Sequence, residues 1–292
     1  MIRNKILFFL LILFFSAWVL FFPSLLFAQK TDSSQHKNRK LYFWSGYGLG
    51  YSTGMYILYQ AWYKDFKHSS FHWFNDSHEW CQMDKLGHAY SSYHLAESTF
   101  NGLTWVGYSH QKAVLWASIT SFITISSIEL FDAYSIKWGA SYGDLVANST
   151  GTALFFIQRS TSFSPLTIKF SFHKSQYAAL RPDALGKYWY EQVLKDYNGQ
   201  TYWLSVNPYE CGIKKIPPWI NVSWGYSAKK MISGNDDNAY RQYFLSLDIN
   251  SKSIHTKNKW LNTLLKSFNL IKIPFPAIEY SKNKLYGHWL YF

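Results

Sequence analysis

The sequence has little charge and little cysteine, and it lacks several motifs that would identify an enzyme. Charged residues make up 16% of the chain, below the roughly 25% that is usual for soluble proteins. The two cysteines, Cys81 and Cys211, belong to no CxxC pair and to no zinc-binding pattern. The sequence also contains no HExxH motif. These absences argue against the common zinc hydrolases.

Apolar, aromatic and basic residues dominate instead. Aromatic residues account for 21% of the 292 residues, and the formal net charge is +12 at pH 7. Nucleic acid is not an expected partner, because the chain has no recognisable RNA- or DNA-binding motif and no long run of lysine and arginine. An anionic membrane surface is the better expectation for so basic and apolar a chain. The sequence predicts no particular protein partner.

The N-terminus is typical of an exported protein. Arg3 and Lys5 precede a long uncharged run that reaches a small residue at Ala28. Residues 1–28 are therefore predicted to be a signal peptide, or, because the run is long enough to cross a bilayer, a retained N-terminal anchor. Residues 29–40 are polar and basic and are predicted to be a linker. We expect an exported protein, whose two cysteines either form one disulfide in an oxidising compartment or stay unrelated thiols.

Residues 41–160 are predicted to be helical. Four largely apolar segments are joined by short polar links, which favours an antiparallel four-helix bundle. The first of these segments has no charge and is long enough to span a membrane. Its four glycines would let neighbouring helices approach closely. The bundle is accordingly expected to be membrane-associated.

Ionisable and amide side chains interrupt these apolar segments in three places. Buried groups of this kind are costly, so they either satisfy one another or do chemistry. In an antiparallel bundle the start of the second helix, the end of the third and the start of the fourth lie at one end. The residues predicted to converge there are Asp84, Lys85, His88, Glu129, Asp132, Asp144 and Asn148.

The first interpretation of this cluster is structural. Lys85 would pair with Glu129 or Asp132, while His88 and Asn148 would bond across helices and fix their packing. On this interpretation the chain is a non-enzymatic protein that serves the integrity of the envelope.

The second interpretation is a site for chemistry on a lipid or lipid-linked headgroup. A divalent metal could be held by nitrogen and oxygen ligands drawn from Asp84, His88, Glu129, Asp132, Asp144 and Asn148. Without a metal, His88 could act as a general base oriented by Asp84, Glu129 or Asp132, with Lys85 stabilising negative charge. The chain would then be a hydrolase or a transferase.

Residues 161–292 differ in pattern from the helical part. Short segments of alternating polarity, separated by turn-rich stretches, predict a β-rich antiparallel region, and residues 181–197 predict one short helix. Two forms are open, namely a half-buried sheet packed on the bundle and an outer-membrane barrel, which the aromatic strands and the terminal Phe292 would suit. We favour the packed sheet, so the predicted fold class is α+β.

The helical motifs carry a resemblance to a known family. Met83-Asp84-Lys85-Leu86-Gly87-His88, Glu129-x-x-Asp132 and Ser141-x-x-Asp144-x-x-x-Asn148-x-x-Gly151 resemble the YfiM-like predicted periplasmic lipoproteins. They are similar, more remotely, to VanZ-like membrane proteins, which share a D-K-x-x-H helix followed by E and D-x-x-x-N helices. The resemblance covers about residues 40–160 and implies a bacterial envelope protein of uncharacterised activity, membrane-associated on the periplasmic side. This chain departs from the lipoprotein pattern because no cysteine lies near Ala28.

Overall fold

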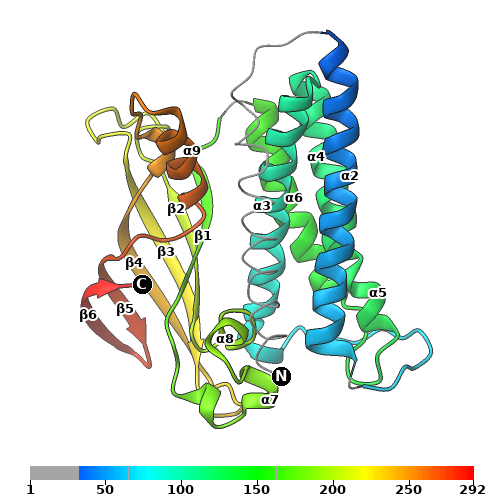
Figure 1. The fold of residues 1–292 in the computed structure, drawn as a ribbon. Helices are drawn as coiled ribbons and strands as arrows, with labels where there is room; N and C mark the ends of the chain where they lie inside the picture. Colours follow the sequence, from blue (N-terminus) through cyan, green and yellow to red (C-terminus); the bar gives the residue numbers. More distant parts are fainter. Residues whose placement is uncertain (1–32, 65, 162) are drawn as a thin grey trace. The chain divides into compact units, whose positions relative to one another are not determined.

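The computed structural model describes residues 33–64, 66–161 and 163–292 (Figure 1). The signal peptide or anchor predicted for residues 1–28 lies outside the described residues. The chain divides into two compact units. The helical unit comprises the described residues up to 75 together with 91–160, and the sheet unit comprises 76–90 together with 161–292.

Five α-helices contribute to the described part of the helical unit. They are α2 (Ser33–Leu58, continued by a π-helical turn, Tyr59–Tyr63), α3 (Met83–Val106), α4 (His110–Ser126), α5 (Ile128–Ala133) and α6 (Tyr142–Thr161). Helix α2 begins inside the segment that the sequence predicts to be a linker. Helix α3 is continuous, although its first two turns belong to the sheet unit and the remainder to the helical unit.

Polar side chains join these helices across their apolar contacts. The Ser121 hydroxyl on α4 donates to the backbone carbonyl oxygen of Ser92 on α3 at 2.6 Å. Arg159 on α6 pairs with Glu97 on α3 at 2.5 Å. Ser92 lies one helical turn after His88, so the bond from Ser121 fixes α3 against α4 close to His88.

The predicted membrane-associated four-helix bundle is wrong. The third predicted helix is divided into α4 and α5, because the regular helix is interrupted at Ser127. The first turns of α3 do not complete a bundle either, since Met83 and Tyr90 pack against Tyr202 in the sheet unit. The sequence shows that α3 has an apolar face, but it does not show what covers that face.

Membrane association of the helices is likewise not established. Among the described helices, one segment, His110–Ala133, is long and apolar enough to cross a membrane. Core helices of other proteins meet the same condition, so this segment alone does not place the helical unit in a bilayer.

The C-terminal part contains an antiparallel sheet of six strands, as the sequence predicts for that region. The strands follow the order of the chain: β1 (Leu166–Phe172), β2 (Gln200–Val206), β3 (Ile220–Lys229), β4 (Tyr240–Ile249), β5 (Phe275–Ser281) and β6 (Lys284–Tyr291). Just before β5, the chain also pairs in parallel with β1. The Phe170 amide donates to the carbonyl oxygen of Leu270 at 3.0 Å, and the Lys272 amide donates to that of Phe170 at 2.9 Å. One extended segment therefore bonds to both β1 and β4, so the sheet curls.

Three short helices accompany the sheet, where the sequence predicts one. Helices α7 (Pro182–Leu185) and α8 (Trp189–Lys195) lie between β1 and β2, and α9 (Lys259–Phe268) lies between β4 and β5. Gly186 ends α7 with a φ of 94°, a conformation that side chains with a Cβ rarely adopt. This glycine divides the single predicted helix into two.

The cysteines are not joined. Cys81, in the segment before α3, and Cys211, in the turn after β2, are both free thiols. The disulfide alternative is therefore wrong, and the alternative of two unrelated thiols holds.

The two faces of the sheet differ sharply in polarity. On the inner face, Lys169 and Asp248 form an ion pair at 2.6 Å with both side chains completely buried. The hydroxyl of Ser205 donates to the same aspartate at 2.9 Å. Trp203 and Phe244 are the large apolar side chains of this face. The core of the sheet unit is thus part aromatic and part ionic.

Candidate functional site

Two acidic residues of the helical unit are buried beside the short link between α5 and α6. Glu129 lies in the first turn of α5 and Asp144 in the first turn of α6, with 4% and 5% of their surfaces exposed. Ser141 connects them, because its backbone amide donates to Glu129 Oε2 at 2.9 Å and its hydroxyl accepts from the Asp144 amide at 3.2 Å. The hydroxyl of Ser141 thus bonds to the N-terminal turn of α6, and its amide holds the Glu129 carboxylate next to that turn.

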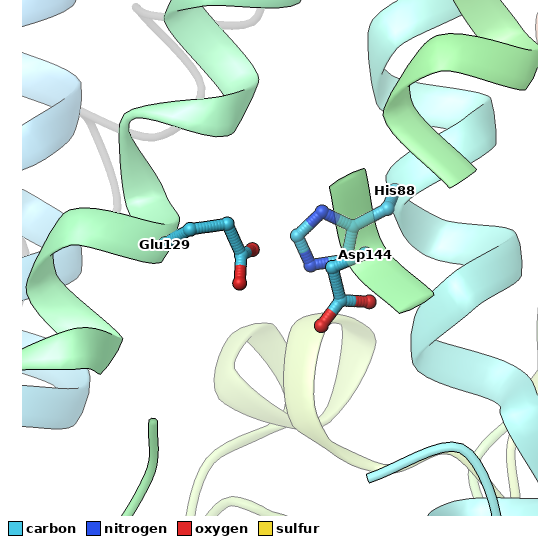
Figure 2. A group of neighbouring side chains, drawn as sticks. All are labelled: His88, Glu129 and Asp144. Atoms are coloured by element: carbon cyan, nitrogen blue, oxygen red, sulfur yellow. The ribbon is translucent and has the colours of Figure 1, made fainter. Parts of the chain in front are cut away.

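His88 on α3 completes this group. Figure 2 shows the side chains of His88 and Glu129 pointing toward one another, with the carboxylate of Asp144 next to them. One ligand atom from each of the three residues lies within 4.8 Å of the other two.

The three side chains form a donor set that suits a divalent cation. Two buried carboxylates this close repel one another unless a proton or a cation lies between them. Imidazole nitrogen and carboxylate oxygen are common ligands of zinc and of related divalent metals. Ligand atoms at about 2.1 Å from one zinc ion stand roughly 3 to 4 Å apart, so a small closing movement of these side chains would place all three around one ion.

Lys85 and Asp84 bond to one another at the start of α3. The Lys85 ammonium lies 2.9 Å from Asp84 Oδ2 and 2.7 Å from Asp76 Oδ2. Asp76 was not among the residues singled out from the sequence, since it lies in an irregular segment before α3 and belongs to no spacing pattern. With two carboxylates around it, Lys85 is largely neutralised, which weakens its predicted role in stabilising the charge of a substrate.

Asp132 and Asn148 bond to side chains of the helical unit. Asp132 accepts from the Tyr63 hydroxyl at 2.8 Å, and the Asn148 amide donates to the Ser126 hydroxyl at 3.2 Å. Burial, together with the negative charge of Asp132, holds the pKa of Tyr63 far above its ordinary value, so Tyr63 stays a donor. The sequence gives no signal for Tyr63, because it lies 69 positions before Asp132 in the chain.

Comparison with known proteins adds one match. The model of the family described as predicted periplasmic lipoprotein (DUF2279) matches residues 72–160, which include all of the site residues predicted from the sequence. No curated protein and no solved structure matches the chain. The chain is similar to this uncharacterised family over somewhat less than a third of its length, and the match supports an exported protein of the cell envelope.

Proposed function

We propose that this protein is a structural component of the bacterial envelope, in which His88, Glu129 and Asp144 hold one divalent cation that fixes the junction of three helices. The observation that carries the proposal is the approach of three ligand atoms within 4.8 Å, two of them on buried carboxylates. A bound divalent cation would neutralise the two carboxylates and remove the cost of burying them together.

The positions of the ligands in the chain favour a role in stability. Glu129 lies just after the turn at Ser127, and Asp144 lies just after the link from α5 to α6. A cation bound there would join elements from three separate parts of the chain, so its binding free energy would add to the free energy of unfolding. At a free cation concentration 100 times the dissociation constant, the gain is about 2.7 kcal/mol. The alternative prediction, a hydrolase or transferase acting on a lipid headgroup, would use the same three ligands. We place the role in stability first because the ligands come from three separate parts of the chain.

The periplasmic side of the envelope and an anionic lipid surface complete the proposal. Support for the location comes from the similarity to predicted periplasmic lipoproteins. Support for the lipid partner is the net charge of +12, which favours an anionic surface by Coulomb attraction.

The test is the metal content and thermal stability of the full chain, purified in detergent. Substitutions Glu129→Gln and Asp144→Asn keep the shape of each side chain and remove its charge. Asp183→Asn is the matched control, because the Asp183 side chain is 76% exposed. We expect close to one equivalent of metal in the wild type and in the control, and its loss in both site variants. We also expect a chelator to lower the melting temperature of the wild type and of the control, and to leave that of the two metal-free site variants unchanged.

Two results would overturn the proposal. One is a metal-free wild type that neither gains stability from added Zn²⁺, Mn²⁺ or Mg²⁺ nor loses stability with a chelator. The other is a higher melting temperature in Asp144→Asn than in the wild type under the same conditions, because relief of repulsion would show that no cation lies between the carboxylates.

A further inference from the structure

The curled sheet carries apolar side chains on its outer face, which reverses the usual arrangement of a sheet in a water-soluble protein. Antiparallel sheets normally turn their apolar face to the core and their polar face to water. Here the buried inner positions include serines, glutamine and charged residues, whereas the outer positions of β3–β6 are apolar and exposed. We define the outer apolar face by Trp224, Leu245, Leu247, Ile278, Leu285 and Trp289, whose surfaces are between 45% and 91% exposed.

The register of the strands places these side chains in rows. Trp224 pairs with Leu245, Leu245 with Ile278, and Ile278 with Gly287, so one row crosses four strands. Directly paired residues in adjacent strands point to the same side of a sheet. The apolar positions are therefore contiguous and are not scattered single side chains, which would need no explanation.

A row of tyrosines borders the aliphatic rows. Tyr226 pairs with Tyr243, and Tyr243 with Tyr280. The exposed, charged Arg241 lies two positions before Tyr243 in β4 and donates to the Tyr226 hydroxyl at 3.0 Å. That hydroxyl donates to the carbonyl oxygen of Cys81 at 2.7 Å. Aromatic rings with a polar tip, set between an apolar band and charged side chains, are typical of protein surfaces at the boundary between lipid and water.

Side chains of the polar inner face bond to one another. Glu279 accepts from Ser281 at 2.7 Å and pairs with His288 at 2.8 Å. The Ser205 and Ser223 hydroxyls bond to one another at 2.6 Å. Because these inner polar side chains bond to one another, the outer face is the one left for an apolar partner. The same alternation, apolar outward and polar inward, occurs in strands that face lipid.

The dimensions of the face indicate how deep such a contact would reach. From the tyrosine row to Ile220 at the start of β3 is six residues, or about 20 Å along a strand at roughly 3.3 Å per residue. A strand tilted by about 40° would bring this to about 15 Å, which is half of the roughly 30 Å hydrocarbon core of a bilayer. The face therefore matches one leaflet. It also has a hollow of about 580 Å³ lined by residues that include Val222, Gly287 and Trp289, where an acyl chain could lie.

We propose that the outer apolar face of β3–β6 inserts into the hydrocarbon of one leaflet of an envelope membrane, with the tyrosine row at the lipid–water boundary. This contact lies in the sheet unit and is independent of the cation cluster. It attaches the protein to lipid through the folded sheet, whatever becomes of residues 1–28.

The test compares two labelled positions in the full chain. Cys81→Ser and Cys211→Ser remove the native thiols, and Ile278→Cys or Ile213→Cys introduces one new thiol for an environment-sensitive fluorophore. The two isoleucines are equally exposed, at 53%, but Ile213 lies in the link between β2 and β3. Each labelled protein is added to vesicles of phosphatidylcholine and phosphatidylglycerol, with plain or brominated acyl chains. Bromine quenches only fluorophores within the hydrocarbon.

We expect the label at position 278 to shift to shorter wavelength and to be quenched by brominated lipid at least threefold more than the label at 213. Leu245→Cys should behave like Ile278→Cys, which guards against a folding defect in one variant. Equal quenching at 278 and 213 would overturn the proposal, even if the protein binds the vesicles through its N-terminus. A wavelength shift at 278 without quenching would also overturn it, and would indicate that protein covers the face.

Discussion

Removal of the negative charge at Asp248 tests whether the polar inner face of the sheet depends on its buried ion pair. Asp248 accepts from the Lys169 ammonium at 2.6 Å and from the Ser205 hydroxyl at 2.9 Å, and neither member of the ion pair is exposed. Asp248→Asn keeps the size of the side chain but leaves Lys169 buried without its counter-charge. The lysine retains one bond, to the carbonyl oxygen of Ile249 at 2.7 Å.

The expected loss follows from these contacts. Breaking a buried ion pair by removing one partner costs about 3 to 5 kcal/mol. The remaining bond to Ile249 and the amide of the new asparagine offset part of this, so we expect about 3 kcal/mol for Asp248→Asn. The double substitution Lys169→Met with Asp248→Leu removes both charges, and we expect it to cost less than the single change, because no uncompensated charge stays buried.

The assay is equilibrium unfolding in denaturant of the full chain in detergent, with Asp237→Asn as the control. Asp237 is exposed, so its variant should stay within about 0.5 kcal/mol of the wild type. A loss below about 1 kcal/mol for Asp248→Asn would refute the reasoning. So would a double variant that loses more stability than Lys169→Met and Asp248→Leu lose in sum as single variants, because the coupling would then have the wrong sign.

Two further changes test the helical unit and the segment before α3. A Cβ at Gly102 would lie 2.1 Å from the ring of Phe43, whereas one at Gly48 would meet nothing within 4 Å. In thermal unfolding, Gly102→Ala should therefore lower the free energy of unfolding by about 1 to 3 kcal/mol through overpacking. Gly48→Ala should raise it by up to about 1 kcal/mol, because alanine favours the helix more than glycine does. Equal effects of the two changes would contradict the packing of α2 on α3. Burial, and then the charges of two neighbouring aspartates, raise the pKa of Glu79. Its ionised form is thus disfavoured in the folded state. Glu79→Gln should therefore stabilise the protein at a pH above the folded-state pKa of Glu79 and make no difference at a pH below its unfolded-state pKa. A gain in stability that does not change with pH would contradict this prediction.

The local chemistry of the candidate site could be read from the sequence. The spacing of Asp84, His88, Glu129 and Asp144 within apolar segments marks them as costly to bury, and this holds in any fold that buries them. The spacing of these residues along the sequence does not determine which of their side chains come together. The structure brings His88, Glu129 and Asp144 together, and it pairs Lys85 with Asp76, a residue that belongs to no pattern.

The strand pattern of the C-terminal part was also legible, because alternation with a period of two is a local property. Alternation does not say which face turns inward. In β4 the polar set (Gln242, Ser246, Asp248) and the apolar set (Tyr243, Leu245, Leu247) are equally regular, and the structure buries the polar set.

The sequence by itself determined the composition, the helical and β-rich halves and the residues able to carry chemistry, since each depends on neighbours in the chain. Only the tertiary structure decided the break between α4 and α5, the contact of α3 with the sheet and the inward direction of the polar face. These depend on contacts between distant segments, such as the pairing of Phe170 with Ile271 that curls the sheet. The free energy of such contacts exists only once the chain has folded, so no local pattern in the sequence records it.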